Sequence, residues 1–223
     1  MIIPEGRELL NTERTIAKAL FDECETLLDV FSKISDFIKK IGPTLSSDEY
    51  YSPEDGVFIA KEAKIDKSAT ILPPTIIGRA EVRPGAYIRG SVIVGDGAVI
   101  GNSTEIKNAI IFDEAQLPHY NYVGDSIIGH KAHMGAGAVI SNFKLDHKPI
   151  KIRSGDEVLE TGLRKMGAIL GDFAEVGCGS VIFPGSIIGR RAMIYPLTPV
   201  RGVIPADTII HEGGRTTKRN PEE

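Results

Sequence analysis

The chain has 223 residues, enough for one domain of good size with an appendage, and 42% of them are hydrophobic. The formal net charge is −4 and no long basic run occurs. This argues against a general nucleic-acid binder, because such proteins bind largely by neutralising phosphates. No stretch resembles a membrane span or a secretory leader, so we expect a cytoplasmic protein with neither nucleic acid nor membrane as a partner.

Residues 1–42 are expected to form an amphipathic helical segment, as one long helix or as two. Asn11 or Thr12 would cap its start, and Gly42-Pro43 ends it. We expect the apolar stripe to pack on its own domain or on a sister subunit, with docking of a partner protein as the alternative. The stripe recurs at intervals of three and four residues, at Ile16, Leu20, Cys24, Leu27, Phe31, Ile34, Ile38 and Ile41.

Residues 43–56 have the composition of a linker, and from residue 57 to residue 210 the period becomes six. A small or β-branched residue follows each aliphatic one after four positions, and Ile110 is the one large exception. Such a repeat predicts an all-β solenoid, in which each short strand buries one aliphatic and one small residue. The aliphatic positions are Ile59, Ile65, Ile71, Ile76, Val82, Ile88, Val94, Ile100, Ile106, Ile128, Met134, Leu170, Val176, Ile182, Ile188 and Ile194.

Two interruptions of the six-residue repeat are predicted. One lies between Phe112 and Ile128, and the other lies between Ile140 and Leu170, where we expect a loop insertion at about 143–168. Residues 211–223 are expected to form a flexible tail. Insertions in a solenoid become surface loops that often lie on the binding face. Polar residues gather at both places, in the runs 118–125 and 141–148.

Four motifs, in a fixed order, carry a resemblance to a known family. They are Arg-Pro-Gly at 83–85, Glu-Ile-Lys at 105–107, His-x-x-Tyr-x-Gly-Asp at 119–125, and Gly-Ala-Gly at 135–137 followed by Asn142. The repeats resemble the hexapeptide-repeat acyltransferase family. The motifs resemble the acetyltransferase half of the bifunctional enzyme that acetylates glucosamine-1-phosphate and then uridylylates the product, and the matching half of archaeal-type sugar-1-phosphate nucleotidylyltransferases. This resemblance, over about 76–203, implies a left-handed parallel β-helix and a homotrimer.

The resemblance also implies an activity. It is acetyl-CoA-dependent N-acetylation of glucosamine-1-phosphate or galactosamine-1-phosphate in nucleotide-sugar synthesis, with no metal required. His119 would be the general base for the attacking amine, a task that suits a neutral imidazole near pH 7. Ala136 and Cys178 would lie beside acetyl-CoA. The residues implied to hold the sugar phosphate are Arg83, Lys107, Tyr122, Asn142 and Lys148.

The chain departs from the family pattern in places that keep two alternatives open. Residues 194–200, Ile-Tyr-Pro-Leu-Thr-Pro-Val, stand where an Ala-Gly-Thr type segment is common, and the glycine-rich motif of a nucleotidyltransferase half does not occur. These departures favour a non-catalytic subunit that binds sugar phosphates or a partner protein. The other alternative is a γ-type carbonic anhydrase, because imidazole is a good zinc ligand and four histidines lie close in sequence: His119, His130, His133 and His147.

Overall fold

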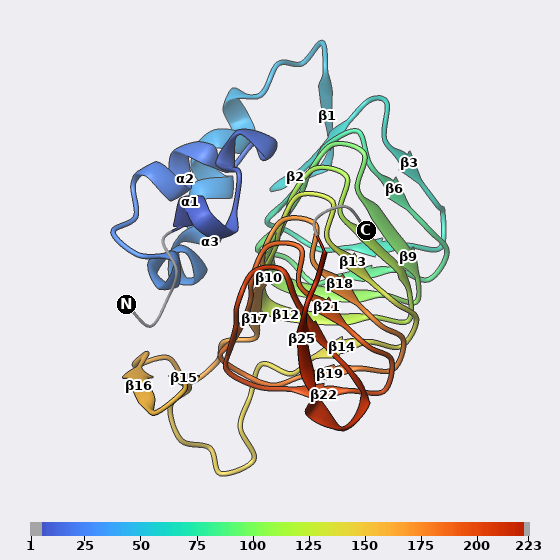
Figure 1. The fold of residues 1–223 in the computed structure, drawn as a ribbon. Coiled ribbons are helices and arrows are strands. Elements are labelled where there is room, and N and C mark those ends of the chain that lie inside the picture. Colours follow the sequence, from blue (N-terminus) through green and yellow to red (C-terminus); the bar gives the residue numbers. More distant parts are fainter. Residues whose placement is uncertain (1–5, 221–223) are drawn as a thin grey trace.

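The computed structural model describes residues 6–220, and residues 57–210 wind into a parallel β-helix (Figure 1). Each regular coil gives one short strand to each of three faces, which we call A, B and C. Face A consists of β2 (Val57–Ala60), β5 (Thr75–Ile77), β8 (Val92–Val94), the second halves of β10 (Glu105–Ile111) and β12 (Tyr122–Ile128), β17 (Ala168–Leu170), β20 (Ser186–Ile188) and β23 (Val203–Ile204). The solenoid predicted from the repeat is confirmed.

The other two faces are built in the same way. Face B consists of β3 (Lys64–Ile65), β6 (Glu81–Val82), β9 (Val99–Asn102), β11 (Gln116–His119), β13 (His133–Met134), β18 (Glu175–Val176), β21 (Met193–Ile194) and β24 (Thr208–Ile210). Face C consists of β4 (Thr70–Ile71), β7 (Tyr87–Ile88), the first halves of β10 and β12, β14 (Val139–Ile140), β19 (Val181–Ile182) and β22 (Pro199–Val200). Equivalent aliphatic residues of successive coils stack in register and form one continuous core.

On face A the phase of the repeat, meaning which of two neighbouring residues points into the core, differs from the prediction. Ile77 faces the core and Ile76 faces outward, where the reverse was expected. Likewise Ala109 fills the small core position that was assigned to Ile110, which points outward. The reason is that several coils have 17 residues where three hexads would need 18, as the pairing of Ile77 with Val94 shows.

The predicted interruption between Phe112 and Ile128 is wrong. Leu117 and Val123 continue the core through this stretch, and Leu117 pairs with Ile100 of the coil before. Two corners shortened by one residue displaced the expected six-residue positions without breaking the solenoid. The segment around His119 is therefore part of a regular coil.

An insertion lies between β14 and β17. Ile128 pairs with Leu170, 42 positions later, whereas it pairs with Ile111 only 17 positions earlier. Within the insertion β15 (Lys151–Ser154) and β16 (Glu157–Glu160) form an antiparallel hairpin beside the lower end of face A (Figure 1). The hairpin covers that end of face A through Ile150 and Ile152, which are fully buried.

The amino-terminal helices cover the rest of face A (Figure 1). They are α1 (Gly6–Leu9), the 3-10 turn η1 (Thr12–Arg14), α2 (Lys18–Asp22), α3 (Leu27–Ile41) and the 3-10 turn η2 (Gly42–Thr44). The helix breaks before α3 because Thr26 and Asp29 form a capping box there. Ile34 and Ile38 of α3 are buried in one cluster with the outward isoleucines of face A. From Leu20 to Ile41 the apolar stripe is thus packed on the chain's own domain, whereas Ile16, its first predicted residue, is exposed.

Both segments that flank the β-helix add strands to it. In the expected linker 43–56, β1 (Tyr50–Glu54) pairs antiparallel with β2. Residues 211–220 differ from the expected flexible tail, since η3 (Glu212–Gly214) leads into β25 (Thr216–Lys218), which pairs antiparallel with β24. This pairing gives hydrogen-bond partners to backbone groups of β24, which would otherwise form an open edge of face B. Residues 221–223 of that tail and residues 1–5 of the helical segment lie outside the described part. Among residues 6–220 no helix has the length and apolarity needed to cross a membrane.

Candidate functional site

Three of the predicted site residues stack at the corner between faces B and C. The backbone N–H of Gly137 donates to the carbonyl of His119 over 3.0 Å, and the N–H of Gly179 donates to the carbonyl of Ala136 over 2.9 Å. His119, Ala136 and Cys178 therefore occupy the same place in three successive coils, about 4.8 Å apart from one coil to the next. All three are exposed. We call this stack the B/C corner.

The B/C corner is an open ledge because of its backbone conformation. The residue that turns each coil is in the left-handed region, with φ of 51° at Tyr120, 70° at Gly137 and 67° at Gly179. A Cβ added to Gly137 would find nothing within 4 Å. The ledge beside His119 is thus open above Gly137.

The side chain of Asn121 holds two coils of this corner together. It is 2% exposed, and its amide donates to the carbonyls of Gly135 over 2.9 Å and Ala138 over 3.1 Å. Its Oδ1 accepts from the backbone N–H of His119 over 3.2 Å. Asn121 therefore fixes the turn that carries His119 against the turn that carries Ala136. Asn121 lies within the polar run 118–125, but no role for it was predicted from the sequence.

The side chains of a second group of predicted residues converge toward the other edge of face C. Lys107 is in register with Gly124 of the next coil. Asn142 Nδ2 and Tyr122 Oη would lie 2.6 Å and 2.8 Å from a Cβ added to Gly124, so both side chains converge over that glycine. Burial, aided by the nearby Glu105 and Asp125 carboxylates, raises the pKa of the Tyr122 phenol. The phenol is therefore a protonated donor at neutral pH.

Arg83 and Lys148 lie apart from this second group. Arg83 directly follows β6 of face B and pairs with Glu81 over 2.8 Å, so its charge is already matched. Lys148 lies exposed in the insertion, where its backbone N–H donates to the Asp146 carboxylate over 3.1 Å. Glu105, a motif residue without an assigned role, pairs with Arg89 over 2.7 Å.

Asp125 is a buried acid beside the second group that sequence analysis left without a role. It is 6% exposed and accepts hydrogen bonds from the side-chain amides of Asn142 and, over 2.9 Å, Asn108. Asn108 and Asp125 turn the corner between faces C and A at φ of 47° and 48°, which short polar side chains tolerate. Asn108 also donates to the carbonyl of Phe31 over 3.2 Å, which ties α3 to this corner. The motif at 119–125 was the available signal for Asp125.

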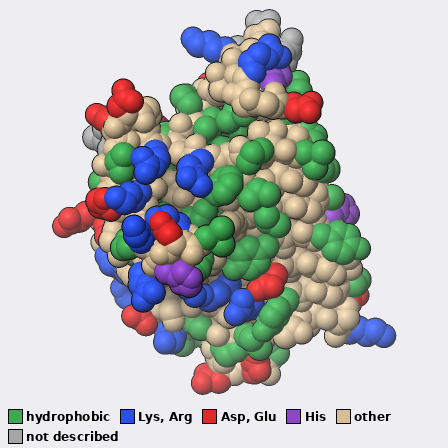
Figure 2. Space-filling view, turned by 90° about the horizontal axis from the view of Figure 1, so that it is seen from below, with side chains coloured by type: hydrophobic (Ala, Val, Ile, Leu, Met, Phe, Trp, Pro, Cys, Tyr) green, Lys and Arg blue, Asp and Glu red, His purple; other side chains and the backbone are tan. Residues whose placement is uncertain are grey.

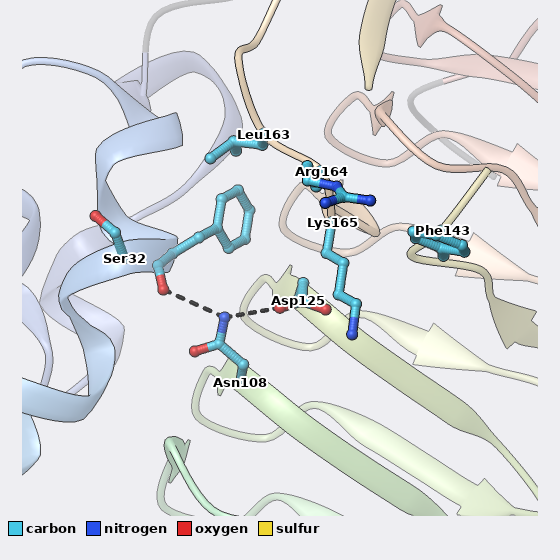
Figure 3. A pocket seen from close by; sticks show the side chains of 8 residues that line it. Ser32, Asn108, Asp125, Phe143, Leu163, Arg164 and Lys165 are labelled. Carbon is cyan, nitrogen blue, oxygen red and sulfur yellow. Dashed lines mark hydrogen bonds between the residues drawn. The ribbon is translucent and has the colours of Figure 1, made fainter. Parts of the chain in front are cut away.

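A groove opens above this corner, between α3, the corner and the insertion (Figure 3). We call it the α3 groove; its volume is about 580 Å³. In Figure 3 the side chains of Arg164 and Lys165 extend from the returning arm of the insertion toward Phe143 and Asp125. The lining residues are Phe31, Ser32, Asn108, Asp125, Phe143, Leu163, Arg164 and Lys165.

Face C is not covered by helices or by the hairpin. Figure 2 shows hydrophobic side chains gathered over this face and Lys and Arg side chains gathered on the side of the insertion. The outward positions of its successive strands form an in-register ladder of Tyr122, Val139, Val181 and Pro199. Face C is therefore a flat, largely apolar surface with positive charge along one edge.

The histidines that sequence analysis considered as zinc ligands lie in different surroundings. The His130 ring contacts the carbonyl of Asp113 over 2.8 Å, and the His133 ring contacts the Glu175 carboxylate over 3.1 Å. Within the described residues of this single chain, no three His, Cys, Asp or Glu side chains are grouped so that they could hold a metal ion.

Comparison with known proteins agrees with the motifs. A bifunctional sugar-1-phosphate nucleotidylyltransferase/acetyltransferase of Sulfurisphaera tokodaii is 36% identical over 64% of this chain, but the match spans only 37% of that protein's length. An uncharacterized acetyltransferase of Escherichia coli, YaiX, is 33% identical over 70% of this chain and 74% of its own length. Among solved structures, the polySia-specific acetyltransferase NeuO superposes with a TM-score of 0.48 at 13% identity, over 75% of this chain and 88% of that one.

The family assignment follows from the part of the chain that is matched. The model of the GMPPB C-terminal domain matches residues 79–195, which include the B/C corner, the second group and the insertion. This is more than half of the chain. The resemblance drawn from the motifs is confirmed at the level of family: the chain belongs to the GMPPB C-terminal domain family.

Proposed function

We propose that this chain is an acetyl-CoA-dependent N-acetyltransferase whose acceptor is an amino sugar carrying a 1-phosphate, glucosamine-1-phosphate or galactosamine-1-phosphate. The observation that carries the proposal is the stacking of His119, Ala136 and Cys178 on one open ledge, at the edge of a face whose other edge carries Lys107, Tyr122 and Asn142. The names of two relatives, which both include the word acetyltransferase, support the same reading.

His119 is the group we assign to proton transfer. Its ring is exposed, and its backbone is fixed through Asn121, so the imidazole is held at the ledge. Acetyl-CoA supplies the acetyl group as a thioester. As the amine forms the new N–C bond and the C–S bond breaks, His119 takes the proton from the amine and passes it to the departing thiolate. Tyr122 and Asn142 orient the sugar, and Lys107 attracts the phosphate.

We further propose that face C is the surface on which copies of the chain meet as a trimer. Its apolar ladder is uncovered, whereas face A is buried under the helices and the hairpin. In one copy Arg83 and Lys148 lie apart from the Tyr122 group, so a neighbouring copy would have to bring them to the acceptor. Light scattering of the purified chain tests this: a trimeric mass supports it, and a monomeric mass excludes it.

Thiol release from acetyl-CoA tests the proposed activity. The wild type should release thiol only when glucosamine-1-phosphate or galactosamine-1-phosphate is present. His119→Ala should lower that rate by about 10²–10⁴-fold, the usual effect of losing a positioned base. The control is Lys61→Ala, at an exposed position of the first coil between β2 and β3, and it should leave the rate near that of the wild type. Absence of turnover with both acceptors would refute the proposal.

A further inference from the structure

The α3 groove continues onto the surface that we propose for the amino sugar. Asn142 links the two: its amide lies beside Tyr122 over Gly124, and it also donates to Asp125, which lines the groove. A ligand that occupies the groove can therefore extend directly across face C. None of the residues that line the groove is used by the proposed acetyl transfer.

The charge of the groove favours an anion. Arg164 and Lys165 are exposed at its wall, and within the described residues neither forms an ion pair, nor does the nearby Lys107. The one carboxylate among the lining residues, that of Asp125, accepts from two side-chain amides, and the two cations outnumber it. Cationic donors without partners bind phosphate oxyanions well, and a guanidinium can do so through two parallel hydrogen bonds.

The size and the apolar part of the groove require more than a phosphate. A volume of about 580 Å³ lies within the range of small-molecule sites and far exceeds one phosphate group. Phe143 and Leu163 line it on the side of the insertion, and Ser32 lines it on the side of α3. An aromatic ring beside a few polar groups suits a planar, hydrogen-bonding base. Phe143 is itself held by an edge-to-face contact with the His147 ring at 5.0 Å.

The distance across face C points the same way. Six residues of one coil separate His119 from Asp125, and in extended chain they span at most about 20 Å. A sugar joined through a diphosphate to a nucleoside has the length to place its base in the groove and its sugar over Tyr122, on the way to His119.

We propose that the α3 groove binds the nucleoside diphosphate part of a nucleotide-activated amino sugar. Arg164 and Lys165 hold the diphosphate, Phe143 contacts the base, and the sugar lies across face C. The inference rests on the proposed function and extends its acceptor from the free amino-sugar phosphate to the same sugar linked to a nucleotide.

Calorimetric titration of the full chain without acetyl-CoA tests the groove. UDP, dTDP and GDP are compared with inorganic pyrophosphate as the probe for charge alone. At least one nucleoside diphosphate should bind about tenfold more tightly than pyrophosphate, an interval of about 1.4 kcal/mol. The Arg164→Ala/Lys165→Ala variant should lose about tenfold in affinity for both kinds of probe. Phe143→Ala should weaken only the nucleotide, and Arg153→Ala, an exposed basic residue of the hairpin away from the groove, should change neither.

The outcomes separate the two proposals. Equal binding of pyrophosphate and all three nucleotides, or wild-type nucleotide affinity in the double variant, overturns the groove assignment. If glucosamine-1-phosphate is acetylated while no nucleotide binds, the inference fails and the proposed function stands. If a nucleotide binds in the groove while no amino sugar, free or nucleotide-linked, is acetylated, the nucleotide site stands and the acetyltransferase proposal fails.

Discussion

Replacing Asn121 by alanine should destabilise the protein more than any other single amide substitution at the B/C corner. The side chain is buried and makes three hydrogen bonds, two as donor to backbone carbonyls and one as acceptor from His119 N–H. Each contributes about 1 kcal/mol net, and the unpaired carbonyls left behind add a desolvation cost, so the expected loss is about 3 kcal/mol. The control is Asn102→Ala: it removes one exposed hydrogen bond, to the carbonyl of Pro84 over 2.9 Å, and should cost at most about 1 kcal/mol.

Urea unfolding followed by circular dichroism measures both Asn121→Ala and Asn102→Ala. Stacked coils can unfold in parts, so the midpoint of the whole unfolding transition is compared between the variants. The dependence of the unfolding free energy on urea concentration should be the same in both variants. The folded Asn121→Ala protein should also turn over more slowly, since the backbone of His119 loses its anchor. Unfolding free energies of the two variants within about 0.5 kcal/mol of each other would refute the role given to this amide.

Three further predictions concern the scaffold. Gly101→Ala should prevent normal folding, because the new Cβ would lie 1.6 Å from the carbonyl oxygen of Pro118; soluble yield and circular dichroism test this. Ile110→Ala should cost about 2–4 kcal/mol in urea unfolding, because Ile110 is fully buried under the helices. Val158→Ala, at an exposed position of the hairpin, should cost less than half as much. Burial raises the pKa of Asp172 in the folded protein above its ordinary 3.8. The stability that this carboxyl contributes is therefore full below pH 3.8 and is lost as the pH rises through its folded pKa. Asp172→Asn should remove that part of the pH dependence of the unfolding midpoint.

The solenoid could be predicted from the sequence because its signal is periodic and local. The phase on face A could not, and the reason is physical. At Ile76-Ile77 and Ile110-Ile111 two neighbouring residues are both buried, one in the core and one under the helices. The alternation of apolar and polar residues that normally reveals the inward residue is therefore absent. When a corner is one residue shorter, the six-residue repeat then assigns the core position to the wrong member of the pair. Adjacent aliphatic pairs were in fact the signal of a covered face.

The candidate site could be predicted only where a motif is contiguous. His119, Tyr122 and Asp125 lie within one short run, so resemblance brought them out together even though Asp125 received no role. The α3 groove could not be foreseen, because its walls come from α3, a corner of the β-helix and the far arm of the insertion. Asn121 was missed because its partners lie 14 and 17 positions later in the chain, a spacing that matters only once the coils are stacked.

The most direct test of the account is the fate of a labelled acetyl group. The wild-type chain is incubated with isotopically labelled acetyl-CoA and glucosamine-1-phosphate, and the sugar product is analysed by mass spectrometry. The label should appear on the amino nitrogen of the sugar, at a rate that His119→Ala lowers by at least about 100-fold. Label transfer at the wild-type rate by His119→Ala, or no transfer to this sugar or its galactosamine counterpart by the wild type, would contradict it.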